Sequence, residues 1–131
     1  MRNDKAVFFV FVVAVLLMFS GSAFAHHGSA AYDMSKTTSV TGTVTDFQYV
    51  NPHVLIAMDV KDPSTGKVVK WEGELTSPNH LSRAGWTKST IKPGDVLTWT
   101  GGPSKTGSPT MWIRKIERNG EVISLGGGGD N

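Results

Sequence analysis

The stretch Ser39-Val40-Thr41-Gly42-Thr43-Val44-Thr45-Asp46-Phe47 decides the fold class, because apolar or small side chains alternate in it with hydroxyl-bearing ones. A period of two is typical of a β-strand that has one face in a core and the other in water. After Asp46 the apolar positions move from even to odd residue numbers, first at Phe47 and then at Tyr49. This change of phase predicts a β-bulge near Asp46 and therefore a long, bent first strand.

Two further strands follow, and each has one apolar face. The apolar positions 54, 56, 58 and 60 share a face of the second strand, and 62–66 has the composition of a turn. The segment 69–75 repeats the pattern, with Trp71 and Leu75 among its apolar residues. Its opposite face should be wet or functional, because it carries three charged side chains, Lys70, Glu72 and Glu74.

The pattern changes once, at a short predicted helix. Ser77 is a good N-cap, and Pro78 suits the first helical position. Gly85 fits the residue just past the end, so the sequence predicts a short helix over 78–84. Trp86 follows it, and we expect its ring to lie as a lid over one end of the domain.

The second half of the chain returns to strands. A turn at 92–95 leads into a fourth strand over 96–100, and a fifth is expected over 110–117. Asn119-Gly120 is typical of a two-residue hairpin turn, here into a short sixth strand over 122–125. This order predicts a mostly β fold, an OB-like (oligonucleotide/oligosaccharide-binding) β-barrel of five or six strands with one short helix between the third and fourth.

The N-terminal segment has the signature of export. Arg2 and Lys5 precede an apolar run over 6–19, and small residues lead from there to Ala25. This pattern predicts a secretory signal peptide over 1–25, cleaved after Ala25, and a periplasmic mature protein. The apolar run is roughly fourteen residues long, whereas a helix that spans a bilayer needs about twenty. We therefore expect no membrane span after cleavage.

The mature chain divides by composition into three zones. Residues 26–38 are polar and small and should form an extended leader, 39–125 should form the barrel domain, and the glycine-rich segment 126–131 should be a flexible tail. The chain has no cysteine, which excludes disulfides and thiolate metal sites. Removal of the signal peptide lowers the formal charge from +2 to +1. A nearly neutral chain gives no electrostatic reason to expect nucleic acid as a partner.

Motifs spread over nearly the whole mature chain resemble those of one family. In order, they are His26-His27-Gly28-Ser29-Ala30-Ala31-Tyr32-Asp33, Val40-Thr41-Gly42-Thr43-Val44, Tyr49-Val50-Asn51-Pro52-His53-Val54, Ser77-Pro78-Asn79, Gly85-Trp86 and Lys92-Pro93-Gly94-Asp95. In this combination the chain resembles the DUF6152 family of exported bacterial proteins. The resemblance implies no activity, because the family has no known function. Family members tend to carry His-His-Ser after cleavage, and the Gly28 found here changes no candidate ligand.

Two adjacent histidines would begin the mature chain. Cleavage after Ala25 would give His26 a free α-amine, and this amine and the ring of the same residue can close a six-membered chelate on Cu(II). His27 can add its imidazole, or the amide between the two residues can deprotonate and bind. Nitrogen ligands of this kind, arranged as a histidine brace, favour copper over other divalent ions. The plainer interpretation is that the pair lies in a disordered leader.

A preorganised copper site would recruit a further histidine from the domain, either His53 or His80. Each has a structural alternative. His53 follows Asn51-Pro52, a strand break at which histidine commonly binds free backbone groups, and His80 falls in the first helical turn, where it can hydrogen-bond the preceding loop. Tyr32 could lie beside the metal or could dock the leader into an apolar groove. Residues that could support the metal or form a binding face are Tyr32, Asp59, Lys70, Glu72 and Glu74.

The function expected from these patterns is that of a small periplasmic binding module, with Cu(II) as the candidate ligand. No phosphate loop, dinucleotide fingerprint, nucleophile elbow or His-Glu-x-x-His motif gives reason to expect an enzyme. The first alternative is a metal-free adaptor whose charged third-strand face binds a partner protein or an oligosaccharide. A copper-dependent oxidase of the brace type is another. Tryptophans could stack on sugars or, as is commoner in small barrels, form core and rim; they are Trp71, Trp86, Trp99 and Trp112.

Overall fold

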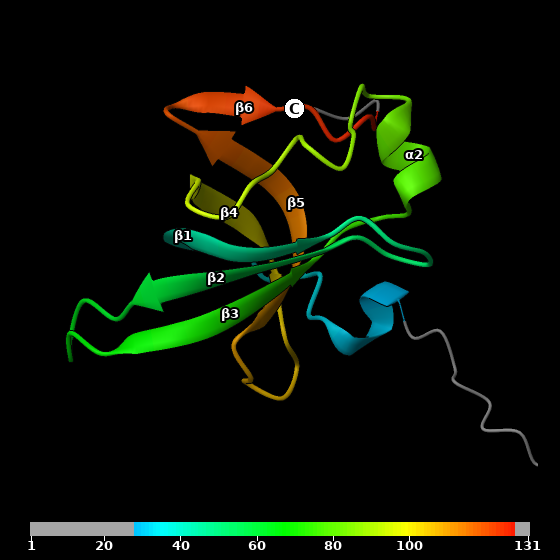
Figure 1. Ribbon diagram of the computed structural model, residues 1–131. Coiled ribbons are helices and arrows are strands. Elements are labelled where there is room, and N and C mark those ends of the chain that lie inside the picture. The colour runs from blue at the N-terminus through cyan, green and yellow to red at the C-terminus, as the bar shows by residue number, and fades with distance from the viewer. Residues whose placement is uncertain (1–27, 128–131) are drawn as a thin grey trace, which may run out of the picture.

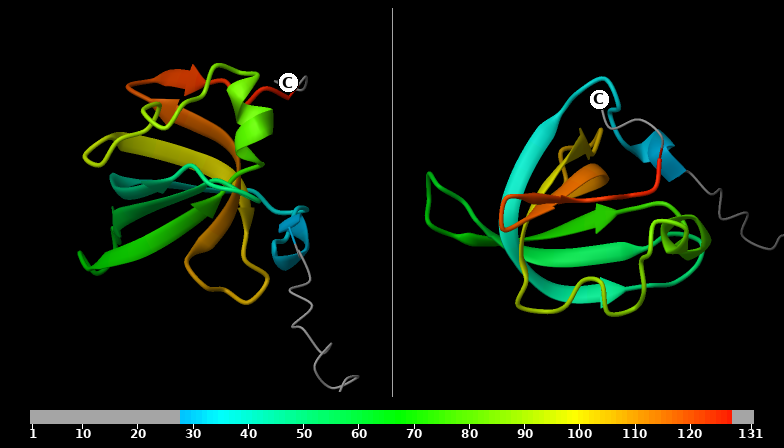
Figure 2. Two further views of the ribbon diagram at one scale, coloured as in Figure 1. Left: turned by 45° about the vertical axis from the view of Figure 1, so that its right-hand side comes forward. Right: turned by 90° about the horizontal axis from the view of Figure 1, so that it is seen from above.

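The computed structural model describes residues 28–127, in which the alternating stretch forms strand β1 (Thr38–Gln48). The pairing of β1 with the next strand along the chain shifts its register between Val44 and Asp46, so the predicted bulge is confirmed. A bulge bends the strand that carries it. In the view from above in Figure 2, β1 accordingly curves round one side of the molecule.

Six strands form a single sheet, with one short helix between the third and the fourth (Figure 1). The other elements are β2 (Leu55–Lys61), β3 (Val68–Glu74), α2 (Pro78–Ser82), β4 (Val96–Pro103), β5 (Thr110–Arg118) and β6 (Glu121–Ile123). Their order in the sheet is β3-β2-β1-β4-β5-β6, and neighbours in this order run antiparallel.

A parallel pairing between β3 and β5 closes the sheet into a five-strand barrel, with β6 as an extra strand. The contact is short and runs from Glu72 opposite Thr110 to Glu74 opposite Trp112. The β2–β3 hairpin projects beyond this point, at the left of Figure 1. The closed barrel with its helix between β3 and β4 confirms the predicted OB-like fold class.

The helix begins as the sequence predicts. Ser77 has the extended backbone of an N-cap, and its Oγ accepts a hydrogen bond from the backbone N–H of His80 at 3.3 Å. The helix ends at Ser82, two residues earlier than expected, and Gly85 follows with a φ of +87°. The Trp86 ring is buried at 3% exposure, as expected of a lid, and its Nε1 donates to the Ser124 carbonyl at 2.7 Å.

Strand boundaries differ from the expected ones in the second half of the chain. β4 continues to Pro103 instead of ending at 100, because its pairing with β5 accommodates a register shift between Thr100 and Gly101. β6 occupies Glu121–Ile123 instead of 122–125. It starts earlier because Asn119 and Gly120, both at positive φ, complete the turn in two residues.

The core fills the barrel interior from all five barrel strands. Ile56 and Trp99 have no exposed surface. Trp71, which the alternation predicts as inward-facing, packs against the core but is only half-buried, because β3 extends past the barrel at that point. The buried apolar residues of the cluster are Val44, Val54, Ile56, Met58, Leu75, Leu81, Trp86, Ile91, Leu97, Trp99, Met111, Ile113 and Ile116.

The leader docks on the barrel without being extended throughout. Its first described residues form a 3-10 turn (Gly28–Ala31), and Tyr32 then pairs as a β-bridge with Ser104. The predicted signal peptide over 1–25, His26, His27 and the last four residues of the predicted tail lie outside the described residues. In the range 28–127 no helix is long and apolar enough to cross a membrane.

Candidate functional site

His53 lies at the end of the loop between β1 and β2, directly before the buried Val54. The imidazole is bonded through Nδ1 to the Oε1 carboxylate oxygen of Glu74, the last residue of β3. Both side chains are largely shielded from water, at 26% exposure for the histidine and 19% for the glutamate. The ring therefore hydrogen-bonds a carboxylate. The structural role predicted for His53 was a hydrogen bond to free backbone groups at the strand break.

Tyr32 of the leader uses the other oxygen of the same carboxylate. Its hydroxyl donates to Glu74 Oε2 at 2.7 Å, and the residue as a whole is 8% exposed. Burial raises the pKa of the Tyr32 phenol far above its usual range, and the hydrogen bond to Glu74 and the nearby negative charges raise it further. The phenol is consequently a stable donor, and the candidate residues Tyr32, His53 and Glu74 form one network.

Trp112 completes this network. From the sequence it is expected to be a sugar-stacking, core or rim residue and not a neighbour of the candidate histidines. Its ring meets the His53 ring edge-on, with centroids 5.4 Å apart and an interplanar angle of 88°, and lies 6.1 Å from the Tyr32 ring. The parallel β3–β5 pairing places Trp112 directly opposite Glu74. The available signal was its position between inward-facing Met111 and Ile113, which puts a large aromatic ring on the outer face of β5.

The His53 ring lies close to the start of the described leader. A Cβ atom built on Gly28 would lie 3.9 Å from His53 Cε1, the ring carbon between the two nitrogens. Gly28 directly follows His26 and His27 in the chain. The candidate ligand from the barrel is therefore at the end of the leader that carries the two leader histidines.

The remaining predicted residues lie away from this network. His80 is half-buried on α2, and the first-turn contact found for it is made by its backbone N–H. Asp59 pairs across strands with Lys70 on the projecting hairpin, and Glu72 is exposed on β3. Of the carboxylates considered as supports, Glu74 is the one that contacts a histidine.

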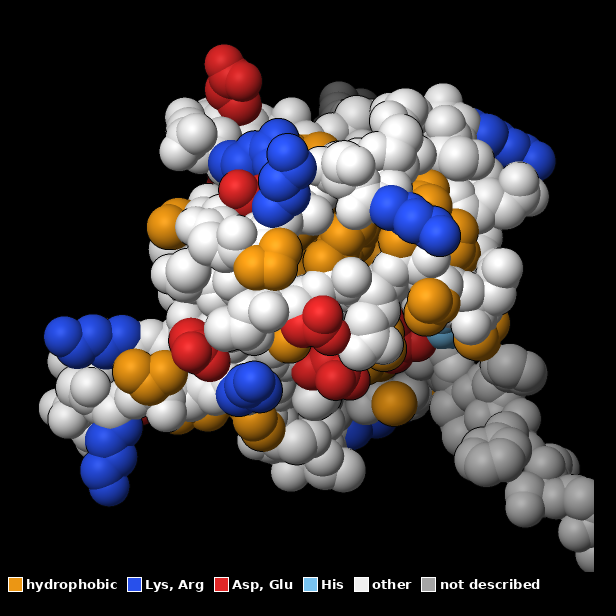
Figure 3. All heavy atoms as spheres, in the orientation of Figure 1, with side chains coloured by type: hydrophobic (Ala, Val, Ile, Leu, Met, Phe, Trp, Pro, Cys, Tyr) orange, Lys and Arg blue, Asp and Glu red, His pale blue; other side chains and the backbone are white. Residues whose placement is uncertain are grey.

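The outer face of the sheet around the network is acidic. Glu72 and Asp46 both lie opposite Ala57, and Asp59 lies next along β2 on the same face. In Figure 3 acidic side chains gather over the middle of the molecule, where β1, β2 and β3 run. On this part of the outer face four carboxylates, Asp46, Asp59, Glu72 and Glu74, outnumber two lysines, Lys61 and Lys70. Such a surface repels a phosphate backbone.

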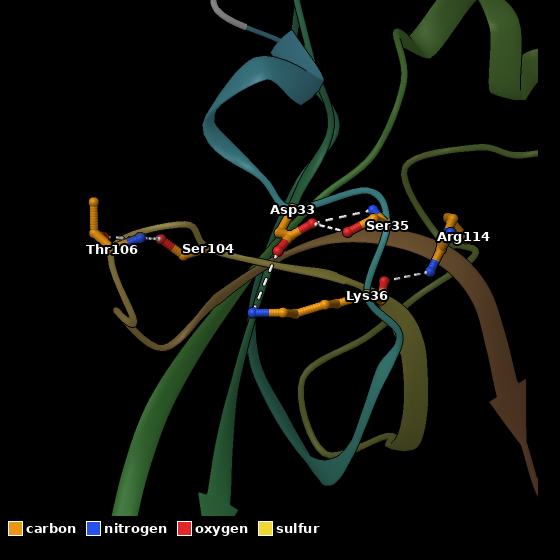
Figure 4. Close-up of polar contacts among 6 residues, drawn as sticks. All are labelled: Asp33, Ser35, Lys36, Ser104, Thr106 and Arg114. Atoms are coloured by element: carbon orange, nitrogen blue, oxygen red, sulfur yellow. Dashed lines mark hydrogen bonds and ion pairs between the residues drawn. The ribbon is translucent and has the colours of Figure 1, made fainter.

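The leader is held at several points besides Tyr32 (Figure 4). Arg114 of β5 donates to the Lys36 carbonyl at 2.8 Å and to the Thr37 hydroxyl at 2.7 Å. Asp33 accepts hydrogen bonds from Ser35, which lower the pKa of its carboxyl. The backbone N–H of Asp33 also donates to the Pro103 carbonyl at 2.8 Å. These contacts fix the path of the leader between Tyr32 and β1.

Residues 28–127 contain no cluster of three or more His, Asp or Glu side chains arranged to hold a metal ion. The network supplies one imidazole and one carboxylate. A metal bound there would need further ligands from outside the described residues.

Comparisons with known proteins identify a family. A family model described as a family of unknown function, DUF6152, matches residues 14–112. No curated protein matches the chain with significance.

Solved structures that match the chain share little sequence with it. The mitochondrial single-stranded DNA binding protein Rim1 from S. cerevisiae is 8% identical, with a TM-score of 0.49, over 64% of this chain and 93% of that one. The protein PriB from Ralstonia solanacearum is 15% identical, with a TM-score of 0.37, over 63% and 97%. A ZRD-deleted mutant of TiaS in complex with agmatine is 17% identical, with a TM-score of 0.46, over 75% and 24%. Likeness of this order carries no information about a shared ligand.

Proposed function

The chain belongs to DUF6152, a family of unknown function, and we propose from its site that it is a periplasmic binding module that holds Cu(II) between its mature N-terminus and His53. The observation that carries the proposal is the position of the His53 ring, whose Cε1 corner lies close to Gly28. The two leader histidines immediately precede that glycine. An imidazole from the barrel is thus available at the end of the leader.

The distances support a shared site. Consecutive Cα atoms are about 3.8 Å apart, so the Cα of His26 cannot be more than about 7.6 Å from that of Gly28. The amine and the side chain of His26 are therefore within reach of a metal ion bound beside Gly28. A single metal ion can therefore be bound by His26 and by His53 without any change in the barrel.

The donor chemistry favours copper among the transition metals. After cleavage behind Ala25, His26 would offer an α-amine and a ring nitrogen, and His27 a second ring or an amide. His53 would add a third nitrogen through Nε2, because its Nδ1 is already bonded to Glu74. Metal-binding histidines commonly use their second nitrogen in this way, with a carboxylate behind the ring. Nitrogen-rich sites without thiolate or thioether suit Cu(II).

The test compares two N-termini of the same protein. One version starts at His26 with a free α-amine, and the other is the same chain with that amine acetylated, so it keeps every imidazole but lacks the amine chelate of His26. Titration with Cu(II) at neutral pH should show at least about tenfold weaker binding by the acetylated version, or about 1.4 kcal/mol. Electron paramagnetic resonance spectra should differ as well, because the acetylated version can bind Cu(II) only through its other nitrogens. Equal affinity and identical spectra would contradict the proposal.

Histidine variants then test the barrel contribution. His53→Ala in the version with the free α-amine should weaken Cu(II) binding and remove one imidazole nitrogen from the spectrum. His80→Ala is the matched control, because His80 is also half-buried but lies on α2 away from the leader. An effect of the same size in both variants would mean that neither residue is a specific ligand.

The metal-free adaptor is distinguished by the exposed residues of β3. Lys70 and Glu72 both lie on the outer face, and neither is a hydrogen-bond partner of His53 or Glu74, although the charge of Glu72 acts on Tyr32. Their double replacement by alanine should leave Cu(II) binding unchanged under the copper proposal. An adaptor would lose capture of its periplasmic partner in this variant, whether or not copper is present.

A further inference from the structure

We infer that Tyr32 is a positioning residue of the proposed copper site, which orients the His53 ring through Glu74 and holds the leader beside it. This inference rests on the proposed function. It adds an explanation of how the orientation and the tautomer of His53 are fixed before a metal binds. Three contacts support it: one joins His53 to Glu74, and two are made by Tyr32, with Glu74 and with the backbone around it.

The first contact determines which nitrogen of His53 is free. A carboxylate only accepts hydrogen bonds, so the Nδ1 atom bonded to Glu74 Oε1 must carry the hydrogen. In the neutral ring the lone pair is then on Nε2, which is the form that binds a metal. The Glu74 carboxylate thereby selects the tautomer of His53.

The second contact keeps the carboxylate in place. The Tyr32 hydroxyl donates to Glu74 Oε2 at 2.7 Å, so each carboxylate oxygen has its own donor. Tyr32 is 8% exposed, and its phenol cannot turn to water without leaving Glu74. Trp112 packs against both rings, with centroids 5.4 Å from His53 and 6.1 Å from Tyr32, and limits their rotation. Loss of the hydroxyl would free one carboxylate oxygen and weaken the constraint on His53.

The third contact fixes the leader at the same point. The backbone of Tyr32 bridges to Ser104, and its N–H donates to the Ser29 carbonyl at 3.0 Å, closing the turn that begins at Gly28. One residue therefore holds the first described turn of the leader and also the carboxylate that the barrel imidazole binds. Copper binding and leader docking should be coupled through it.

The experiment uses Tyr32→Phe in the mature protein that starts at His26. Phenylalanine keeps the ring that packs on Trp112 and removes only the hydroxyl. Tyr49→Phe is the matched control, because the Tyr49 hydroxyl donates to backbone carbonyls, of Pro78 at 2.9 Å and of Trp86 at 3.3 Å, and not to Glu74. Nitrogen-15 NMR of the metal-free proteins reads the tautomer of His53, and electron paramagnetic resonance with Cu(II) counts the bound imidazoles.

The wild type and Tyr49→Phe should show a single Nδ1–H tautomer of His53 and an imidazole from the barrel on the copper. Tyr32→Phe should show mixed tautomers, and its Cu(II) affinity should fall severalfold, to the level of His53→Ala. Leader docking should respond too, with Cu(II) slowing amide exchange of residues 29–37 in the wild type and not in Tyr32→Phe. If Tyr32→Phe does not fold, Glu74→Gln should produce the same spectral changes, because a neutral amide cannot accept both bonds as the carboxylate does.

The outcomes separate this inference from the function on which it rests. Wild-type binding that depends on the free amine, combined with an unchanged tautomer and spectrum in Tyr32→Phe, would overturn the positioning role alone. Wild-type Cu(II) binding that does not depend on the free α-amine would overturn the proposed function and this inference with it.

Discussion

The hydroxyl of Tyr32 and the Oε2 atom of Glu74 are 2.7 Å apart, although 42 positions separate the two residues in the chain. The bond predicts an alkaline limit to stability. Burial and Glu74 raise the pKa of Tyr32 in the folded protein above the value of about 10 expected in the unfolded chain. The folded state thus holds the proton more tightly, so the contribution of Tyr32 is fully present below about pH 10 and is lost as the pH rises above it. Urea unfolding of wild type and Tyr32→Phe should show a stability difference that shrinks above pH 10, and a constant difference would contradict the assignment.

Glu74 should matter more for stability than its neighbour on the same face. Glu74→Ala leaves the Tyr32 hydroxyl and His53 Nδ1 without their acceptor in a shielded site, which should cost about 1 to 3 kcal/mol. Glu72→Ala removes an exposed carboxylate and should change the free energy of unfolding by no more than about 0.5 kcal/mol. Chemical denaturation of both variants near pH 7 measures the difference. Equal losses of unfolding free energy in the two variants would show that the hydrogen bonds of Glu74 do not stabilise the fold.

Gly101 should not tolerate a methyl group. A Cβ atom there would lie 2.0 Å from the backbone carbonyl oxygen of Trp112, which cannot move without opening the β4–β5 ladder. Gly101→Ala should therefore cost at least about 1 to 3 kcal/mol. Gly127→Ala, where the added atom meets nothing within 4 Å, is the control and should leave the melting temperature unchanged. A stable Gly101→Ala protein would mean that the register of this pair is wrong.

Single-stranded DNA should not bind to the outer face of the barrel. On the part of that face formed by β1, β2 and β3, Asp46, Asp59, Glu72 and Glu74 outnumber Lys61 and Lys70, so a phosphate backbone would meet net negative charge there. Fluorescence anisotropy of a labelled oligothymidylate at low salt should show no binding up to micromolar protein. Binding that weakens steeply with added salt would contradict this prediction.

The fold could be predicted largely because its signals are local. The phase change after Asp46 reports the bulge within the strand that contains it, and Ser77 and Gly85 mark the helix ends through their own backbone preferences. The Asn119-Gly120 turn has the same origin. The boundaries that differ are the end of the helix, the end of β4 and the bounds of β6. The end of β4 depends on its pairing with β5, which no local pattern specifies.

The site was only partly predictable because it is assembled across the sheet. Tyr32, His53 and Glu74 could each be named as candidates from residue type, but their convergence depends on which strands are neighbours. Trp112 joins them through the parallel pairing of β3 with β5, and no local pattern specifies that pairing. Expectations about His26 and His27 stay predictions, since both lie outside the described residues.

The short β3–β5 contact also bears on how the protein assembles. Its partners, from Glu72 opposite Thr110 onward, are separated by the helix and the whole of β4, so loop-closure entropy opposes their meeting. The hairpins among β1, β2 and β3 join neighbours in the chain and can form sooner. Glu74 and Trp112 come together only when the barrel closes, so the orientation of His53 is acquired at a late stage of folding. If the chain is exported and binds copper as proposed, its leader histidines would be present from the start and His53 would be oriented last, so copper captured early would be held less tightly than copper bound by the finished barrel.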